Sequence, residues 1–337
     1  MFFFIAVFVF GLAYVLIPLA IGVSWKIGAV DVPHDFRRLH QKPIPRGGGL
    51  AIFFSFAVGF CLLFDLHSPF WLCVLLGGAA MLLLGLIDDV FCLGAWSKLL
   101  LQTGIATAVA VVAGFTEPFS LLAVVFWILL LTNAHNMIDG MDGLLAGCAV
   151  VEGSLLCLAY ALLGSSDLSQ CVGLLCACSI AFYLYNRFPA SVFAGDCGSE
   201  CIGFLFGLLS IPLFSIAETP LSTVSPLFLF AYPLTDLASA VLRRALRGKK
   251  LFSADRGHLH HRLYSAGLSQ RATIGILASI AFCFASIGVL LCVERLWLFA
   301  SIGCIGTVCV LLGMRQGILS FARKKDKKEK IRLLENK

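Results

Sequence analysis

Charged side chains are scarce in this sequence. Only 13% of its 337 residues are Asp, Glu, Lys or Arg, and 60% are hydrophobic, whereas a soluble domain is roughly a quarter charged. The chain also lacks a low-complexity segment, a linker and an internal repeat. These absences argue against a soluble protein and against several domains. They predict one integral membrane domain over residues 1–314, followed by a basic cytoplasmic tail over residues 315–337.

Three further absences narrow the class of protein. The amino terminus has no basic leading region and no small-residue cleavage site, so its first apolar run is expected to be a retained helix. The 14 cysteines lie mostly inside apolar runs, and no second Cys/His pair follows at zinc-site spacing, which argues against a disulfide framework and a zinc site. No soluble domain remains that would bind nucleic acid.

Long apolar runs dominate instead. Runs of about twenty residues are long enough to cross a bilayer, and continuous rather than alternating runs indicate helices and not a barrel. The sequence therefore predicts an all-α, polytopic integral membrane protein with about eleven transmembrane helices. We expect them near residues 3–25, 48–66, 69–87, 99–115, 119–135, 143–163, 168–186, 200–216, 222–240, 271–293 and 296–314.

The basic residues predict the orientation. If the amino terminus lies outside, the inside loops and the tail hold or border 24 of the 25 Lys and Arg residues, and only Arg295 lies outside. Short cytoplasmic loops enriched in Lys and Arg follow the positive-inside rule. We therefore expect an amino terminus outside and a carboxyl terminus in the cytoplasm. The inside loops also carry every polar cluster, so any chemistry is expected on the cytoplasmic face.

Two inside loops combine cations with other anion-binding features. The first contains Lys42, Arg46, Gly47 and Gly48, and cations beside free N–H groups at a helix N-terminus form an anion site. A basic topology loop is the alternative. The other loop contains His258, His260, His261 and Arg262. Hydrogen bonding to a phosphate or sugar is favoured there, and a transition-metal site or a plain basic loop are the alternatives.

Paired carboxylates end the third predicted span. Asp88 and Asp89 close this apolar run, and Lys98 follows one loop later. Carboxylates at the end of an apolar helix are costly unless a cation or metal pairs with them. Because neighbours on a helix point about 100° apart, these two acids are expected to serve different partners. A solvated helix end is the alternative.

Residues 133–143 form the richest polar segment. It holds Asn133, Asn136, Asp139 and Asp142. The two asparagines are three residues apart, as are the two aspartates, so the side chains of each pair share a face if the segment is helical. Its glycines permit a turn instead. Such oxygen ligands suit Mg²⁺, which takes one or two carboxylates and leaves its other positions to water and phosphate. A merely structural polar loop is the alternative.

The last candidate segment begins at Arg187 and ends in Gly195, Asp196, Gly198 and Ser199. The two glycines bracket Asp196 and place it at the start of a helix. A carboxylate, or a metal-bound phosphate that it holds, is well positioned there. An N-cap aspartate without a catalytic role is the alternative.

Taken together, these segments resemble the polyprenyl-phosphate N-acetylhexosamine-1-phosphate transferases, glycosyltransferase family 4. The likeness covers nearly the whole chain and includes residues 31–48, 88–89, 133–143, 195–199 and 258–262 in the family's order. The form His-Leu-His-His-Arg-Leu at 258–263 is similar to the WecA- and TagO-like branch rather than the muramoyl-pentapeptide branch. Glu200 departs from the family pattern, in which an apolar or small polar residue is more usual.

The resemblance implies a Mg²⁺-dependent phosphotransferase of the bacterial inner membrane. It would transfer an N-acetylhexosamine 1-phosphate, with GlcNAc-1-phosphate expected, from a UDP-sugar to undecaprenyl phosphate in the bilayer, and release UMP. This is the first membrane step of cell-envelope glycans such as O-antigen or teichoic acid. Two other hypotheses are a phospho-MurNAc-pentapeptide-type transferase and an ion-coupled transporter. The transporter is disfavoured because the acids cluster at one end of the spans.

The resemblance also implies roles for single residues. Asp196 and Asn136 are expected to bind Mg²⁺, for which Mn²⁺ could substitute, and Asp88 or Asp89 to contact the lipid phosphate. Lys42 and Arg46 would bind the anionic groups of the substrates. The nucleotide sugar would be positioned by Asp139, Asp142, His258, His260 and His261. Further expected substrate contacts are Gly47, Gly48, Lys98, Asn133, Arg187, Gly195, Ser199 and Arg262. The sequence leaves open the exact amino sugar, the lipid length, direct transfer or a phospho-aspartate, and a homodimer.

Overall fold

Helices make up most of the computed structural model, which describes residues 1–33, 42–216, 222–248 and 257–293. The long helices are α1 (Phe2–Ile27), α2 (Gly48–Leu63), α3 (Pro69–Phe91), α4 (Ala95–Val112), α5 (Pro118–Ile138), α6 (Leu144–Leu162), α7 (Ser166–Asn186), α8 (Gly195–Ser210), α11 (Ala231–Leu246) and α13 (Gln270–Val293). Short elements are α9 (Leu213–Ile216), η1 (Ser222–Val224), α10 (Ser225–Leu229), α12 (Leu259–Ser265), and the antiparallel strands β1 (Val30–Asp31) and β2 (Ile44–Pro45).

The predicted class, an all-α polytopic membrane protein, is confirmed. Eight helical segments in the described ranges are long and apolar enough to cross a bilayer: α1, α3, α4, α5, α6, α7, α13 and the segment Gly195–Ile216 that contains α8. Helix α2 is shorter, with 16 residues. The predicted span at 296–314 and the tail at 315–337 lie outside the described residues. The number of eleven spans therefore stays a prediction.

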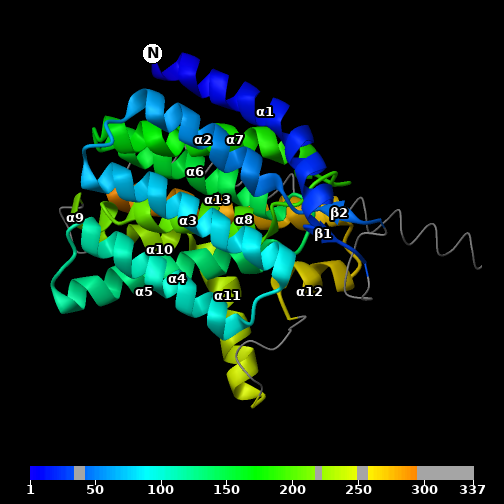
Figure 1. Ribbon diagram of the computed structural model, residues 1–337. Helices are drawn as coiled ribbons and strands as arrows, with labels where there is room; N and C mark the ends of the chain where they lie inside the picture. The colour runs from blue at the N-terminus through cyan, green and yellow to red at the C-terminus, as the bar shows by residue number, and fades with distance from the viewer. Residues whose placement is uncertain (34–41, 217–221, 249–256, 294–337) are drawn as a thin grey trace, which may run out of the picture.

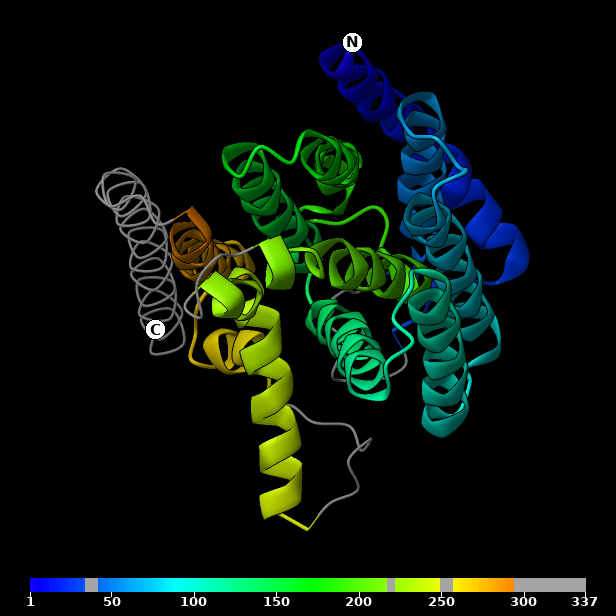
Figure 2. The ribbon, with the colours of Figure 1, turned by 90° about the vertical axis from the view of Figure 1, so that its left-hand side faces the viewer.

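The predicted span at 222–240 is broken rather than continuous. The segment Ser222–Leu229 and helix α11 meet at a bend of 73°, and α11 projects away from the other helices (Figures 1 and 2). Pro233 explains where the break falls. In a continuous helix its ring would collide with the carbonyl group of Leu229, four residues earlier, and α10 ends at that residue.

Helix α8 lies inside the bundle, where it contacts α2, α3, α5 and α6. Every residue of α8 except Asp196 is buried. Its contact with α3 is a close approach of backbones, because a methyl group on Gly85 would stand 2.4 Å from the carbonyl oxygen of Asp196. Small residues allow such approaches between helices in membranes. Gly85 therefore allows the last turns of α3 to lie directly against the start of α8.

An ionisable pair connects α5 to α6 in the bundle interior. Nε2 of His135 lies 2.9 Å from Oε2 of Glu152, and Nδ1 of His135 lies 2.9 Å from the carbonyl oxygen of Leu131. Both side chains are fully buried. Ionisable groups at such depth are costly unless they pair. The pair holds the last turn of α5 in place, directly beside Asn136.

Candidate active site

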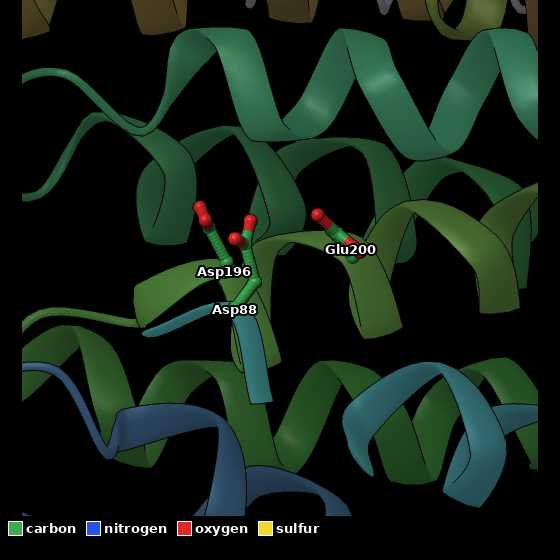
Figure 3. A group of neighbouring side chains, drawn as sticks. All are labelled: Asp88, Asp196 and Glu200. Carbon is green, nitrogen blue, oxygen red and sulfur yellow. The ribbon is translucent and has the colours of Figure 1, made fainter. Parts of the chain in front are cut away.

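Carboxylates from two helices converge at one end of the bundle. Asp88 lies in the last turn of α3, and Asp196 and Glu200 lie four residues apart on the first turns of α8, which puts them on one face. One oxygen atom from each of the three lies within 4.8 Å of the others. Figure 3 shows the carboxylates of Asp88 and Asp196 side by side, with Glu200 one turn further along α8.

Lys98, near the start of α4, places its ammonium group among these carboxylates. Its Nζ atom lies 2.7 Å from Oδ2 of Asp88 and 3.1 Å from Oδ2 of Asp196, and it also contacts Oε1 of Glu200. The lysine side chain is only 16% exposed. One cation is therefore shared by three acids.

Asp89 has different partners from Asp88, as the sequence predicts. Its two carboxylate oxygens accept the backbone N–H groups of Asp196 and Cys197, each at 3.0 Å. It thus caps the start of α8, where a negative charge is favourable. Nη1 of Arg46 lies 3.7 Å from Asp89, while Nη2 of the same arginine donates to Asp31 at 3.0 Å. Arg46 is committed to two carboxylates of the protein itself.

Asn136 brings a side-chain amide to the carboxylate cluster. Its Nδ2 atom donates to Oδ1 of Asp196 at 2.9 Å and to Oε1 of Glu200 at 3.2 Å. Asn133, one turn earlier on α5, donates instead to Gln102 of α4 at 2.9 Å. The two asparagines therefore serve different neighbours, although both lie on the same helix.

The segment after α5 is a turn, not a continuation of the helix. Helix α5 ends at Ile138, and Gly143 adopts the left-handed conformation with φ of 77° before α6 begins. Oδ2 of Asp142 accepts the backbone N–H of Ala190 at 3.0 Å. Of the two arrangements that the sequence leaves open for Asp139 and Asp142, the structure has the turn.

The Asp139 carboxyl group carries a testable pH dependence. Burial raises its pKa from 3.8 to about 7, assisted by the charge of Asp196 and opposed by Arg46. Between these two pH values, Asp139 keeps its proton in the folded chain but has lost it in the unfolded chain. The stability of the fold therefore falls as the pH rises through this window. Asp139→Asn stays neutral throughout. Its melting temperature relative to the native protein should therefore increase from about pH 4 to about pH 7 and then level off.

Thermal unfolding in detergent with a chelator checks this expectation. Asp167→Asn is the matched control, because Asp167 lies exposed in the first turn of α7. A difference in melting temperature between Asp139→Asn and the native protein that stays constant with pH would contradict the assignment.

The histidine segment divides into two kinds of side chain. Nδ1 of His258 lies 2.7 Å from Oδ2 of Asp236, whose other oxygen accepts the N–H of Leu259 at 3.0 Å. His258 therefore anchors the start of α12 to α11. His260 is 1% exposed, and neither of its ring nitrogens has a hydrogen-bond partner among the residues that the structure describes. Burial and the neighbouring histidines lower the pKa of His260 to about 3, which keeps its ring neutral at physiological pH.

His260 packs against the turn that follows α5. A methyl group on Gly140 would stand 2.7 Å from its Nε2 atom. The ring of His261 lies beside that of His260, with centroids 4.3 Å apart. The predicted His segment and the predicted 133–143 segment thus meet in the structure.

The start of α2 differs from the expected anion site. The N–H groups of Gly48 and Gly49 donate to the carbonyl oxygens of Phe193 and Ala194, at 3.0 and 3.1 Å. The prediction that they are free for an anion is wrong, because this helix end docks on the segment before α8. A methyl group on Gly47 would stand 2.0 Å from the Ser24 hydroxyl oxygen. These glycines allow close packing.

Of the other predicted contacts, Gly195 adjoins the carboxylates, because a methyl group on it would stand 2.5 Å from Oδ2 of Asp89. Lys42 and Arg262 are exposed, and the buried hydroxyl of Ser199 donates to the carbonyl oxygen of Gly195 within α8. Arg187 is exposed and lines a cavity of ≈ 830 Å³ together with Asp142, Phe188 and Arg271. Gly195 has φ of 73° and is the first residue of α8. Asp196 therefore lies at the start of a helix, as the sequence predicts.

Sequence reasoning did not include Glu200 or Gln102 among the site residues. Each lies four residues after a residue that it did include, Asp196 and Lys98, and so shares a helical face with it. That spacing was the available signal.

The cluster suits a divalent cation. Asp88, Asp89, Asp196 and Glu200 face two cations, Lys98 and Arg46, and Arg46 is also shared with Asp31. The carboxyl groups therefore outnumber the cations that contact them. Oε2 of Glu200 is buried and has no hydrogen-bond partner in the described part of the chain. Carboxylate and amide oxygens are the ligands that Mg²⁺ prefers.

Comparison with known proteins agrees with this geometry. The model of the family described as glycosyl transferase family 4 matches residues 71–214, a stretch that contains both ends of the carboxylate cluster and Asn136. A protein of Bacillus subtilis (strain 168) named "Probable undecaprenyl-phosphate N-acetylglucosaminyl 1-phosphate transferase" is 33% identical, over 87% of this chain and 86% of its own length.

Two further relatives are named undecaprenyl-phosphate alpha-N-acetylglucosaminyl 1-phosphate transferases. The protein of Escherichia coli (strain K12) is 29% identical over 80% of this chain and 78% of its own length. That of Yersinia pestis is 28% identical over 85% and 82%. The similarity extends over at least 80% of this chain in all three comparisons. The chain is a membrane-embedded transferase and belongs to glycosyl transferase family 4.

Proposed function

We propose that the chain transfers GlcNAc-1-phosphate from UDP-GlcNAc to undecaprenyl phosphate and releases UMP. The names of its relatives support this donor over a UDP-MurNAc-pentapeptide. The observation that carries the proposal is the group of carboxyl side chains at the ends of apolar helices, which outnumber the cations that contact them. Such a site lies within reach of a lipid phosphate in the bilayer and of a nucleotide in water.

The reaction joins two anions. An oxygen of the lipid phosphate attacks the β-phosphorus of the UDP-sugar, and the bond from that phosphorus to the oxygen bridging it to the α-phosphorus breaks, so that UMP leaves. When bound, Mg²⁺ would neutralise charge on the diphosphate and so lower the barrier. Asp196 and Asn136 are the side chains that would hold it. The ammonium of Lys98 is near enough to Asp196 to stabilise the same phosphate charge.

The two acids at the end of α3 take separate roles in this proposal. Asp88 faces the cluster, and we assign it to the lipid phosphate. Asp89 has both oxygens engaged with the start of α8, so it positions Asp196 rather than touching substrate. The turn with Asp139 and Asp142, together with neutral His260, would hold the nucleotide sugar. His258 supports that wall through Asp236.

The same proposal includes the placement in the cell. Residues 1–314 form the transferase domain with eleven spans in the bacterial inner membrane, and residues 315–337 form a basic cytoplasmic tail. The amino terminus lies outside and the site faces the cytoplasm. This orientation is supported by the Lys and Arg distribution and by the position of β1, β2 and α12 at one end of the bundle (Figure 1).

A panel of donors tests the function. Membranes containing the chain are incubated with Mg²⁺, undecaprenyl phosphate and one labelled UDP-sugar at a time. Label from UDP-GlcNAc should enter the lipid, with one UMP released for each sugar transferred. If only another UDP-N-acetylhexosamine labels the lipid, the proposed donor is wrong and that sugar nucleotide is the donor. If only UDP-MurNAc-pentapeptide labels the lipid, the chain is the alternative transferase. If no donor labels the lipid, the proposed function is wrong.

A further inference from the structure

Lys98 occupies the place where a divalent cation would bind. Its ammonium contacts Asp88, Asp196 and Glu200 together, and these three residues supply the oxygen atoms that lie within 4.8 Å of one another. An ammonium group and a metal ion repel each other and need the same lone pairs. The two cations therefore compete for Asp196, which Lys98 contacts and which is the proposed metal ligand.

Glu200 differs from the other two acids in its depth. The Asp196 side chain is 31% exposed, whereas that of Glu200 is fully buried one turn further into α8. Its Oε1 atom contacts Lys98 and accepts a hydrogen bond from Nδ2 of Asn136, and within the described ranges its Oε2 atom has no hydrogen-bond partner. Glu200 thus stays available to a cation that withdraws from the outer carboxylates. The flexible four-carbon stem of lysine permits such a small displacement.

We propose that Lys98 is a resident counter-ion that competes with the divalent cation, and that Glu200 is a positioning residue that retains Lys98 when the metal binds. Without a metal, Lys98 compensates carboxylates whose unpaired burial would be costly. With a metal on Asp196, Glu200 keeps the ammonium paired and close to the phosphates. The inference depends on the proposed function only in taking the ion to be a divalent metal.

Metal binding without substrates tests this inference. The purified full chain is titrated with Mn²⁺ in detergent, and free Mn²⁺ is measured by electron paramagnetic resonance. Lys98→Met should bind Mn²⁺ at least about tenfold more tightly, because a positive charge within a few ångströms is removed. Glu200→Gln should bind it more weakly. Lys26→Met is the matched control, because Lys26 is exposed at the end of α1, and its Mn²⁺ affinity should equal that of the native chain.

A double-mutant cycle separates the role of Glu200 from direct ligation. If Glu200 acts through Lys98, the effect of Glu200→Gln should largely disappear in the Lys98→Met background. An undiminished effect there would mean that Glu200 acts on the metal directly or through Asn136, whose Nδ2 atom donates to Oε1 of Glu200, and would overturn its positioning role through Lys98. Unchanged or weaker Mn²⁺ binding by Lys98→Met would overturn the competition.

A second measurement covers the case in which Lys98→Met does not fold without metal. Lys98→Gln keeps a polar group, and Mg²⁺ should raise its melting temperature more than that of the native chain. A smaller rise would contradict the proposal. Since neither sugar nor lipid is present, these results do not depend on whether the chain labels undecaprenyl phosphate.

Discussion

Asp196→Asn is expected to lower both UMP release and labelling of undecaprenyl phosphate by at least roughly 10²–10³-fold in saturating Mg²⁺. The substitution removes a charge that Lys98 and Asn136 both contact. It should leave the fold intact, because the start of α8 is capped by Asp89 through backbone N–H groups that the variant keeps. The loss would therefore report on chemistry and not on folding.

The control for this variant makes the same chemical change far from the cluster. Asp167 lies exposed in the first turn of α7, and Asp167→Asn should retain native turnover. Both proteins are assayed in purified form, with melting temperatures measured alongside. Near-normal turnover of Asp196→Asn would remove Asp196 from the active site.

Gly85→Ala should destabilise the protein by about 1–3 kcal/mol, the usual cost of overpacking, and should also impair transfer. The added methyl group would stand 2.4 Å from the carbonyl oxygen of Asp196 and 2.5 Å from Cα of Cys197. Backbone atoms cannot give way as a flexible side chain can, so α3 must move away from α8. That movement would separate Asp89 from the N–H groups that it caps and would shift Asp88 relative to Asp196.

Gly104 provides the matched control for this variant. It also lies in the interior of a membrane helix, α4, but a methyl group there would meet nothing within 4 Å. Gly104→Ala should be as stable as the native protein or more stable by up to about 1 kcal/mol, because alanine favours helix over glycine. Thermal unfolding in detergent and the transfer assay compare the two. Native stability and activity of Gly85→Ala would contradict the close approach of α3 and α8.

The arrangement explains why the site needs several distant segments. Lys98 and Asp196 are 98 residues apart, and Asp89 and Asp196 are 107 apart. None of the described helices carries both the carboxylates and the cations of the cluster. Changes that only shift one helix against another are therefore expected to act like changes in the site itself.

Local features of the sequence determined the helices and several details of the site. Apolar length and continuity identify membrane helices, since the bilayer requires both. The glycines around Asp196 correctly predict the start of a helix, and the adjacency of Asp88 and Asp89 correctly predicts different partners. The break before α11 could also have been predicted from the sequence, because in a continuous helix the ring of Pro233 would collide with the carbonyl group of Leu229. The prediction of one span over residues 222–240 did not take this proline into account.

Only the tertiary structure decided which polar groups meet. The N–H groups of Gly48 and Gly49 have carbonyl partners near α8 rather than an anion, His258 is held by Asp236, and Glu200 joins the site through Lys98. Hydropathy could not specify these partners, because one apolar helix face packs against lipid or another helix with similar energy. Pairing is set instead by close approaches at small residues and by buried polar groups that must find one another, and both are properties of the assembled bundle.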